Sequence, residues 1–394
     1  MTSSLTPARS SRVRTGTAAV GLVSVLVLSA CGGGSSTTIG AGGDRPTVTV
    51  SLTDKGCDLD RTTIPAGPVT VTIKNTGTSK VTGVALVAGE RTLAEKERIA
   101  PGGSGAFTLT VKEGSYALRC LGGSPQDQPV TVTRAQAGAT GASTIDDSAE
   151  QAAAAAAYAE YVRGQVAQQV TATKALTDAV REGNLAAAAA AYPAARVNYE
   201  RIEPVSESFD DLDPRLDARI ADVEDVAGWT GYHRLEKAIF ADKSLAGMAA
   251  VAQALQADVF TLQSLVQTVS FTASDLANGA GSLLDEIGKS KITGEEEAYS
   301  HIDFVDFQGN VDGARRAFDL LTPALQKRDA TLVTTITERF TALDKALSAY
   351  RTGSGPTDFH PYSAVPVGQH RVLANLVDAL AAPMSQVGGL LVRK

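Results

Sequence analysis

Residues 147–162 read DSAEQAAAAAAYAEYV, and the character of the chain changes at this stretch. Asp147 and Ser148 are of the types that cap helix N-termini, and the alanine-rich run from Glu150 has high intrinsic helix propensity. From there to Lys394 the chain consists of long segments rich in Ala, Leu and Val. We expect helices interrupted at the Gly, Asn, Ser and Pro positions 183–184, 193, 204, 214, 294, 323, 353–355 and 383. Residues 149–394 are therefore predicted to form an all-α helical bundle.

The preceding part of the chain has the pattern of β-strands. Apolar or β-branched residues alternate with polar ones at 47–52, 69–73, 107–111 and 130–132, with Gly, Pro and Asn turns between these segments. Short strands at roughly ten-residue spacing predict a small β-sandwich over residues 45–134. The Ala, Gly and Thr-rich residues 135–148 are expected to be a linker, which makes this a multidomain α+β protein.

The N-terminus has the features of an export signal. Arg9, Arg12 and Arg14 precede an apolar run, residues 17–30, that is too short to be a comfortable membrane span. The run ends at Cys31 followed by three glycines, which resembles a bacterial lipobox, where the chain is cut before a lipidated cysteine. An ordinary secretory signal with a chance cysteine is the alternative interpretation.

We therefore expect residues 1–31 to be a lipoprotein signal peptide and residues 32–44 to be a flexible tether. The mature protein is expected to be exported and anchored through Cys31 to lipid at the outer face of the cell membrane, periplasmic or on the cell surface. Its formal charge of −7 argues against nucleic-acid binding, which needs a surplus of Lys and Arg, and suits a cationic ligand.

With Cys31 assigned to lipid, two cysteines remain in the β-rich part of the chain. Cys57 and Cys120 form an even pair, and in an oxidising compartment such a pair is interpreted first as a disulfide.

All four histidines lie in the predicted helical part, so imidazole chemistry is confined to it. In the segment GYHRLE, residues 231–236, His233 and Glu236 are three residues apart and would share one helix face. An imidazole nitrogen and a carboxylate oxygen suit iron or zinc. The spacing alone is common in structural or solvent-exposed pairs.

Further acids strengthen the hypothesis of a metal site. Glu200 and Glu203 are also three residues apart, and Asp217 stands near the expected start of the next helix. The segment 294–303, GEEEAYSHID, adds three glutamates, His301 and Asp303, although acids at a helix beginning can simply stabilise its dipole. Oxygen ligands with one imidazole suit Fe(III), Fe(II) or another divalent ion better than a closed structural zinc site.

Three stretches carry a family resemblance: RIEP at 201–204, GYHRLEKAIF at 231–240 and GEEEAYSHIDFVDFQGNVDGA at 294–314. The helical part resembles the imelysin-like or M75 "peptidase" domain, whose mark is Gly-x-His-x-x-Glu. The whole chain resembles the EfeO-type iron uptake lipoproteins, in which a cupredoxin-like β-sandwich precedes the imelysin-like domain. The resemblance implies that the helical domain binds iron in an acidic site and delivers it to a membrane permease.

This resemblance also implies roles for individual residues and partners. An iron permease of the EfeU type and a haem peroxidase of the EfeB type would be its partners. His301 and Asp303 also match the family's motif, but packing and hydrogen bonding between helices is the alternative explanation for both. The implied metal ligands are His233, Glu236, Glu200, Glu203, Asp217 and Glu296.

In the family, the β-domain is thought to hold a second metal site built from cysteines and acids. The matching positions here are Cys57, Cys120, Glu95 and Glu97. Residues 44–140 contain no His and no Met, which excludes a type 1 copper site. Residues 81–86 read VTGVAL where relatives carry acids, so we favour a disulfide, with zinc or copper binding as the alternative.

Two other functions remain as alternatives. A zinc peptidase of the common kind would show His-Glu-x-x-His, but Arg234 follows His233 and the helix offers no second imidazole. We therefore expect no enzymatic activity, and an M75-type metallopeptidase is the weaker alternative. A surface lipoprotein that binds acidic polysaccharides through a metal is the other.

Overall fold

The computed structural model describes residues 46–134 and 149–391, except 90, 123–126, 210, 224 and 290. The expected signal peptide with Cys31, the tether at 32–44 and the linker at 135–148 lie outside the described residues. Among the helices described, none is both long and apolar enough to cross a membrane.

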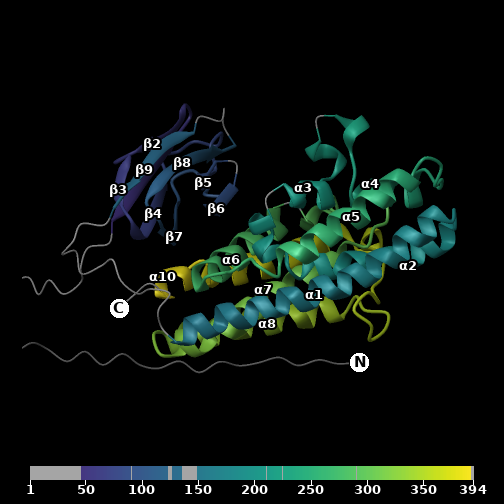
Figure 1. Cartoon of the computed structure of the whole chain (residues 1–394). Coiled ribbons are helices and arrows are strands. Elements are labelled where there is room, and N and C mark those ends of the chain that lie inside the picture. Colours follow the sequence, from purple (N-terminus) through teal and green to yellow (C-terminus); the bar gives the residue numbers. More distant parts are fainter. Residues whose placement is uncertain are drawn as a thin grey trace, which may run out of the picture. The chain divides into compact units, whose positions relative to one another are not determined.

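The N-terminal domain is a sandwich of two β-sheets, which confirms the predicted β-sandwich (Figure 1). In β1, side chains alternate between buried and half-buried, so one face of the strand packs into the core. One sheet has the order β2 (Gly56–Leu59), β1 (Thr47–Thr53), β4 (Gly67–Asn75), β7 (Ser104–Val111). The other has the order β3 (Thr63–Pro65), β9 (Gln128–Thr133), β8 (Gly114–Leu121), β5 (Gly83–Ala88), β6 (Arg91–Lys96).

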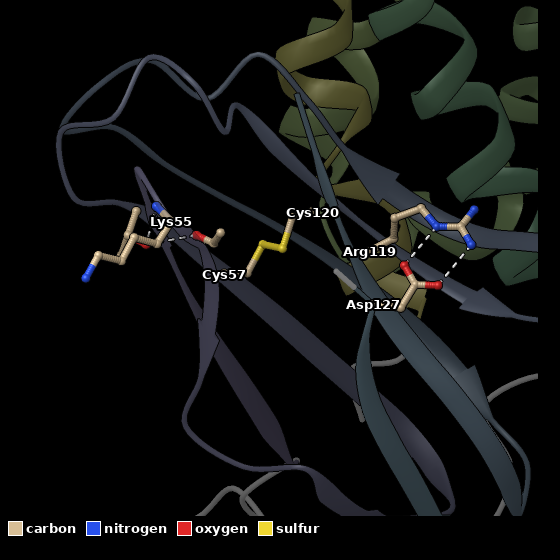
Figure 2. Close-up of a disulfide and its surroundings, with 7 residues drawn as sticks. Lys55, Cys57, Arg119, Cys120 and Asp127 are labelled. Carbon is tan, nitrogen blue, oxygen red and sulfur yellow. Dashed lines mark hydrogen bonds and ion pairs between the residues drawn. A yellow bond between two sulfur atoms is a disulfide. The ribbon is translucent and has the colours of Figure 1, made fainter. Parts of the chain in front are cut away.

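A disulfide joins the two sheets of this sandwich. Figure 2 shows the bond between Cys57 on β2 and Cys120 on β8, and both residues are buried. The two sulfurs are therefore joined to each other in this structure, as expected for a cysteine pair in an exported domain. Closing a loop of 63 residues is worth about 4 kcal/mol of folding stability on loop-entropy grounds.

The C-terminal domain is all-α, as predicted, with long helices packed side by side around one large apolar core. Helix α1 packs against α2, α5 and α7, and α7 also packs against α6 and α8 (Figure 1). The helices are α1 (Ala149–Arg181), α2 (Leu185–Glu200), α3 (Leu212–Asp217), α4 (Tyr232–Glu236), α5 (Ala249–Leu265), α6 (Ala273–Lys289), α7 (Asp303–Gln326), α8 (Ala330–Ser348), α9 (Val367–Met384) and α10 (Val387–Leu391).

Shorter turns connect these helices and carry part of the site described below. They comprise the 3-10 helices η1 (Glu203–Phe209), η2 (Ile220–Asp222), η3 (Val226–Gly228), η5 (Lys291–Thr293) and η6 (Tyr362–Ala364), and one π-helical turn, η4 (Lys237–Ala241), that continues α4.

Some of the predicted helix breaks are correct and others are wrong. The chain does break at Gly183 and Asn184, where the Asn184 side chain accepts a hydrogen bond from the backbone N–H of Ala187 and caps α2. Pro193 and Pro323, in contrast, lie inside α2 and α7. The prolines at 214 and 383 also lie within helices, in α3 and α9. A proline removes one backbone donor, and packing of the flanking turns into the core compensates for that loss.

Candidate metal centre

The GYHRLE segment begins with a glycine that no other residue can replace without strain. Gly231 has a φ of +87°, in the left-handed region that favours glycine. A Cβ at this position would lie 2.4 Å from the backbone oxygen of Leu216. The close approach brings the start of α4 against the end of α3, and therefore brings His233 near Asp217.

His233 and Glu236 share one face of α4, as the spacing predicts. The His233 Nδ1 and Glu236 Oε2 atoms are 3.2 Å apart, and both side chains are buried. The other carboxylate oxygen, Oε1, accepts hydrogen bonds of 2.7 Å from the backbone N–H groups of Tyr299 and Ser300. Both oxygens of Glu236 are thus engaged, and the imidazole ring is held in one orientation.

The opposite ring nitrogen of His233 faces two further acids. Nε2 lies 3.4 Å from Asp217 Oδ1 and 3.8 Å from Glu296 Oε1. It is buried, and it has no hydrogen-bond partner of good geometry among the described residues. Ligand atoms bound to one ion at about 2.1 Å are about 3.0–3.4 Å apart, so a small contraction would allow all three to bind a single cation.

A fully buried arginine lies at the centre of the surrounding acids. The Arg196 guanidinium forms ion pairs with Glu200 and Asp217, lies 3.0 Å from Glu297 and 3.1 Å from Asp306, and is 3.7 Å from Glu296. It also stands over the aromatic ring of Tyr232, with its central carbon 5.4 Å from the ring centroid. Arg196 therefore supplies the positive charge that allows these carboxylates to be buried without an ion.

Lysine 291, in η5, supplies a second buried positive charge. The Lys291 Nζ atom lies 2.7 and 2.8 Å from the two oxygens of Glu203, 3.1 Å from Glu200 Oε2 and 3.4 Å from Glu296 Oε1. Asn310 on α7 donates a hydrogen bond of 2.9 Å to the same Glu200 oxygen. Glu203 thus joins the acidic cluster through Lys291.

Helix α7 reaches the cluster because a glycine permits close contact. A Cβ on Gly309 would lie 2.6 Å from the Cβ of Glu200. Asp306 and Asn310, four residues apart on the same face, flank this contact and point toward Arg196 and Glu200. The Oδ1 atom of Asp306 is buried without a hydrogen-bond partner among the described residues.

The pKa values follow from this crowding of charge. Burial and the charge of Arg196 both act to lower the pKa of His233, but the carboxylates of Asp217 and Glu236 outweigh them and raise it to about 9. Burial acts to raise the pKa of Asp217, yet Arg196 and His233 hold it well below its usual value. Burial, reinforced by the charge of Glu236, raises the pKa of Glu297 well above the ordinary range.

The structure brings all six predicted ligands of the helical domain into this one neighbourhood. One local expectation is wrong: Asp217 is the last residue of α3, not near the start of a helix, because α3 is only six residues long. Within the run 295–297, Glu295 is exposed, while Glu296 and Glu297 are buried in the cluster. His301 is exposed, and Asp303 accepts a hydrogen bond from the backbone N–H of Glu297.

Sequence reasoning missed several members of the cluster. Arg196 stands four residues before Glu200 on α2, a spacing that places both on one helix face and offers a signal. Asp306 lies in the segment that carried the family resemblance, but nothing local separates it from a packing residue. The residues missed are Arg196, Lys291, Asp306 and Asn310, whereas Glu297 belongs to the run of glutamates at 295–297, of which the prediction prefers Glu296.

Among the described residues, three sets of ligand atoms lie close enough together to hold an ion, and all three belong to the helical domain. They are Asp217, His233 and Glu296; His233, Glu236 and Glu297; and Glu200, Glu296 and Asp306. In the part of the chain that the structure describes, Glu95, Glu97 and the two disulfide cysteines form no such set. Glu95 and Glu97 lie on β6 and just after it.

Comparison with known proteins agrees with this two-domain arrangement. Residues 154–387, more than half of the chain, match the family model for imelysin, or peptidase M75, and residues 22–129 match the model for a cupredoxin-like domain. The chain is 37% identical over 361 residues to the iron uptake system component EfeO of Escherichia coli strain K12, which covers 91% of this chain and 94% of that protein. The EfeO proteins of Shigella flexneri and Shigella sonnei strain Ss046 show the same identity and coverage.

Proposed function

Because the chain belongs to the imelysin family and is a homologue of EfeO, we propose that it is an exported component of an iron uptake system that binds an iron ion and delivers it to a membrane permease. The N-terminal sequence supports anchoring to membrane lipid through Cys31. A permease of the EfeU type and a haem peroxidase of the EfeB type are the partners that the homology suggests.

One observation carries the proposal for iron binding. The Nε2 atom of His233 is buried, makes no hydrogen bond of good geometry among the described residues, and faces the carboxylates of Asp217 and Glu296 at the ion-pair distances of 3.4 and 3.8 Å. These contacts are longer than a normal hydrogen bond, and an ion bound between the three groups would satisfy the nitrogen and both carboxylates at close range. One imidazole with two carboxylates suits iron and similar divalent ions.

Glu236 has a different role in this proposal from that of a direct ligand. Its Oε2 atom lies against His233 Nδ1 and its Oε1 atom accepts two backbone hydrogen bonds. It therefore orients the ring and fixes which nitrogen faces the ion. Carboxylates on the far nitrogen of a ligating histidine commonly act in this way.

Neither alternative function is supported by this geometry. A metallopeptidase needs a general base that is free to take a proton from water, but both oxygens of Glu236 are engaged. A site for an acidic polysaccharide needs an open groove, but the exposed fraction of the side chain is 13% for Asp217, 5% for Glu296 and 2% for His233.

The decisive experiment is to titrate the purified mature chain with Mn²⁺, and with Fe²⁺ under anaerobic conditions, and to compare it with the variant His233→Gln. We expect saturable binding of one ion by the wild type, with a rise in melting temperature, and a loss of at least tenfold in affinity for the variant. His360→Gln is the matched control, because His360 is an exposed histidine of the same domain.

Two outcomes would contradict the proposal. The first is no metal binding by the wild type, which would remove the iron-binding function. The second is binding that is equally strong in a folded His233→Gln variant, which would move the ion away from His233. Cleavage of peptides by the metal-loaded protein, abolished in the same variant, would restore the peptidase alternative.

A further inference from the structure

Lys291 places a buried ammonium group beside Glu200 and Glu296, two of the predicted metal ligands. Its side chain is 3% exposed, and its ammonium group is surrounded by carboxylate oxygens of Glu200, Glu203 and Glu296 at 2.7 to 3.4 Å. An ammonium group is a compact point charge with three donors, so it binds such a ring of oxygens much as a metal ion does.

The oxygens bound by Lys291 overlap with the proposed metal ligands. Glu296 belongs to two of the three sets of ligand atoms that can hold an ion, and Glu200 belongs to one of them. The same oxygen, Glu296 Oε1, lies 3.4 Å from Lys291 Nζ and 3.8 Å from His233 Nε2. Binding an ion at His233 therefore requires this oxygen to move toward the ring and to weaken its contact with the ammonium group.

The bound metal ion and the Lys291 ammonium group would also lie close together. An ion bound to Glu296 Oε1 at about 2.1 Å would lie within about 5.5 Å of Lys291 Nζ, given the 3.4 Å between that oxygen and the nitrogen. Since the ammonium group is almost completely buried, solvent screens this repulsion poorly. Lys291 thus acts against the ion both by holding its ligand and by its own charge.

We propose that Lys291 is a built-in counter-cation that competes with the metal for Glu296 and Glu200, and so limits affinity and speeds release. The inference rests on the proposed iron-binding function. In the metal-free state the lysine neutralises the acids and keeps them in place. On release it recaptures Glu296, which suits a protein that must hand its ion to another.

The test compares Lys291→Met and Lys291→Gln with the wild-type mature chain. The methionine has a similar length but no charge, and the glutamine retains hydrogen bonding without the charge. We measure the Kd for Mn²⁺ by calorimetry and the release rate by rapid mixing with excess chelator. Both variants should bind at least about tenfold more tightly and release the ion more slowly.

Lys327→Met is the matched control. Lys327 is a helical-domain lysine whose side chain is 65% exposed and pairs with Glu150, so its removal should leave both quantities unchanged. If Lys291 has a purely structural role, its replacement should displace the metal ligands and weaken metal binding. That result is the opposite of the one expected here.

Unchanged or weaker binding by the folded Lys291 variants would overturn the inference while leaving metal binding by the wild type intact. A wild type that does not bind metal would overturn the proposed function as well. Folding is checked by circular dichroism in the presence of chelator. The melting temperature of each folded variant must rise more on metal addition than that of the wild type, and a smaller rise would refute the inference.

Discussion

Metal binding at this site is expected to release one proton, because His233 is protonated at neutral pH in the metal-free protein. The pKa of His233 is about 9, and its Nε2 atom must lose its proton before it can bind an ion. At pH 7 the group lies about two units below its pKa, so deprotonation costs about 3 kcal/mol and weakens the apparent affinity about a hundredfold. The affinity should therefore rise about tenfold per pH unit above pH 7 and level off near pH 9.

Calorimetry measures this proton directly. Titration with Mn²⁺ in two buffers of different ionisation enthalpy gives the number of protons released per ion bound. We expect a value close to one at pH 7 that falls toward zero above pH 9. The His360→Gln variant should give the same profile. Binding without proton release, with an affinity that is constant between pH 7 and 9, would refute the assignment of Nε2 as a ligand.

The raised pKa of His233 also makes the stability of the metal-free protein depend on pH. The folded-state pKa of His233 is raised from its usual value of about 6.5 to about 9, so the stability that its charged form contributes is fully present below about pH 6.5 and is lost as the pH rises through about 9. The contribution is of the order of 3 kcal/mol. Urea unfolding of the metal-free protein at pH 6.5 and pH 9 should reveal the loss, and His233→Gln should reduce it.

Two further predictions concern the scaffold. Gly231→Ala should destabilise the helical domain by roughly 2–4 kcal/mol, because the residue has a positive φ and the new methyl group would meet the Leu216 carbonyl. Urea unfolding measures this loss of stability. The same substitution should weaken metal binding, which calorimetry measures. Replacing Cys57 and Cys120 together by Ser should cost the β-domain about 4 kcal/mol, measured by thermal unfolding. The Mn²⁺ affinity of that double variant should stay unchanged, and a loss of affinity would show that the cysteines contribute to metal binding.

Most of the fold can be predicted from the sequence because apolar residues recur at different spacings in the two domains. Alternating residues reveal β1, β4, β7 and β9, and the Ala-rich run reveals α1. Other strands cannot be recognised from alternating residues. Strand β5 is buried at five of its six positions and reads as an apolar run without alternation, and β8 has an irregular burial pattern. Pro193 and Pro323 are expected to end helices, but they lie inside continuous ones. Packing keeps these helices continuous, and a local sequence pattern carries no information about packing.

The site is predictable only where its residues are close in sequence. His233 and Glu236 lie on one short helix, so their spacing predicts their contact. Arg196 and Asp306 are 110 residues apart, and Lys291 and Glu200 are 91 apart, so only tertiary packing, such as that of α7 against α2, brings these residues together. A charged side chain in a helix is normally exposed, which is why sequence alone does not suggest that Arg196 lies at the centre of the cluster.

The charges of the cluster explain why one ion exchanges for one proton. A guanidinium group keeps its charge at every accessible pH, so Arg196 keeps Asp217 ionised, with a pKa well below its usual value, and that carboxylate is ready to bind. Glu297 has a raised pKa, because burial and the charge of Glu236 favour its protonated form, and it adds little negative charge. His233 is therefore the ligand that must lose a proton when the ion binds. An incoming divalent cation therefore replaces the single positive charge of the imidazolium and adds one further positive charge, which the surrounding carboxylates can compensate.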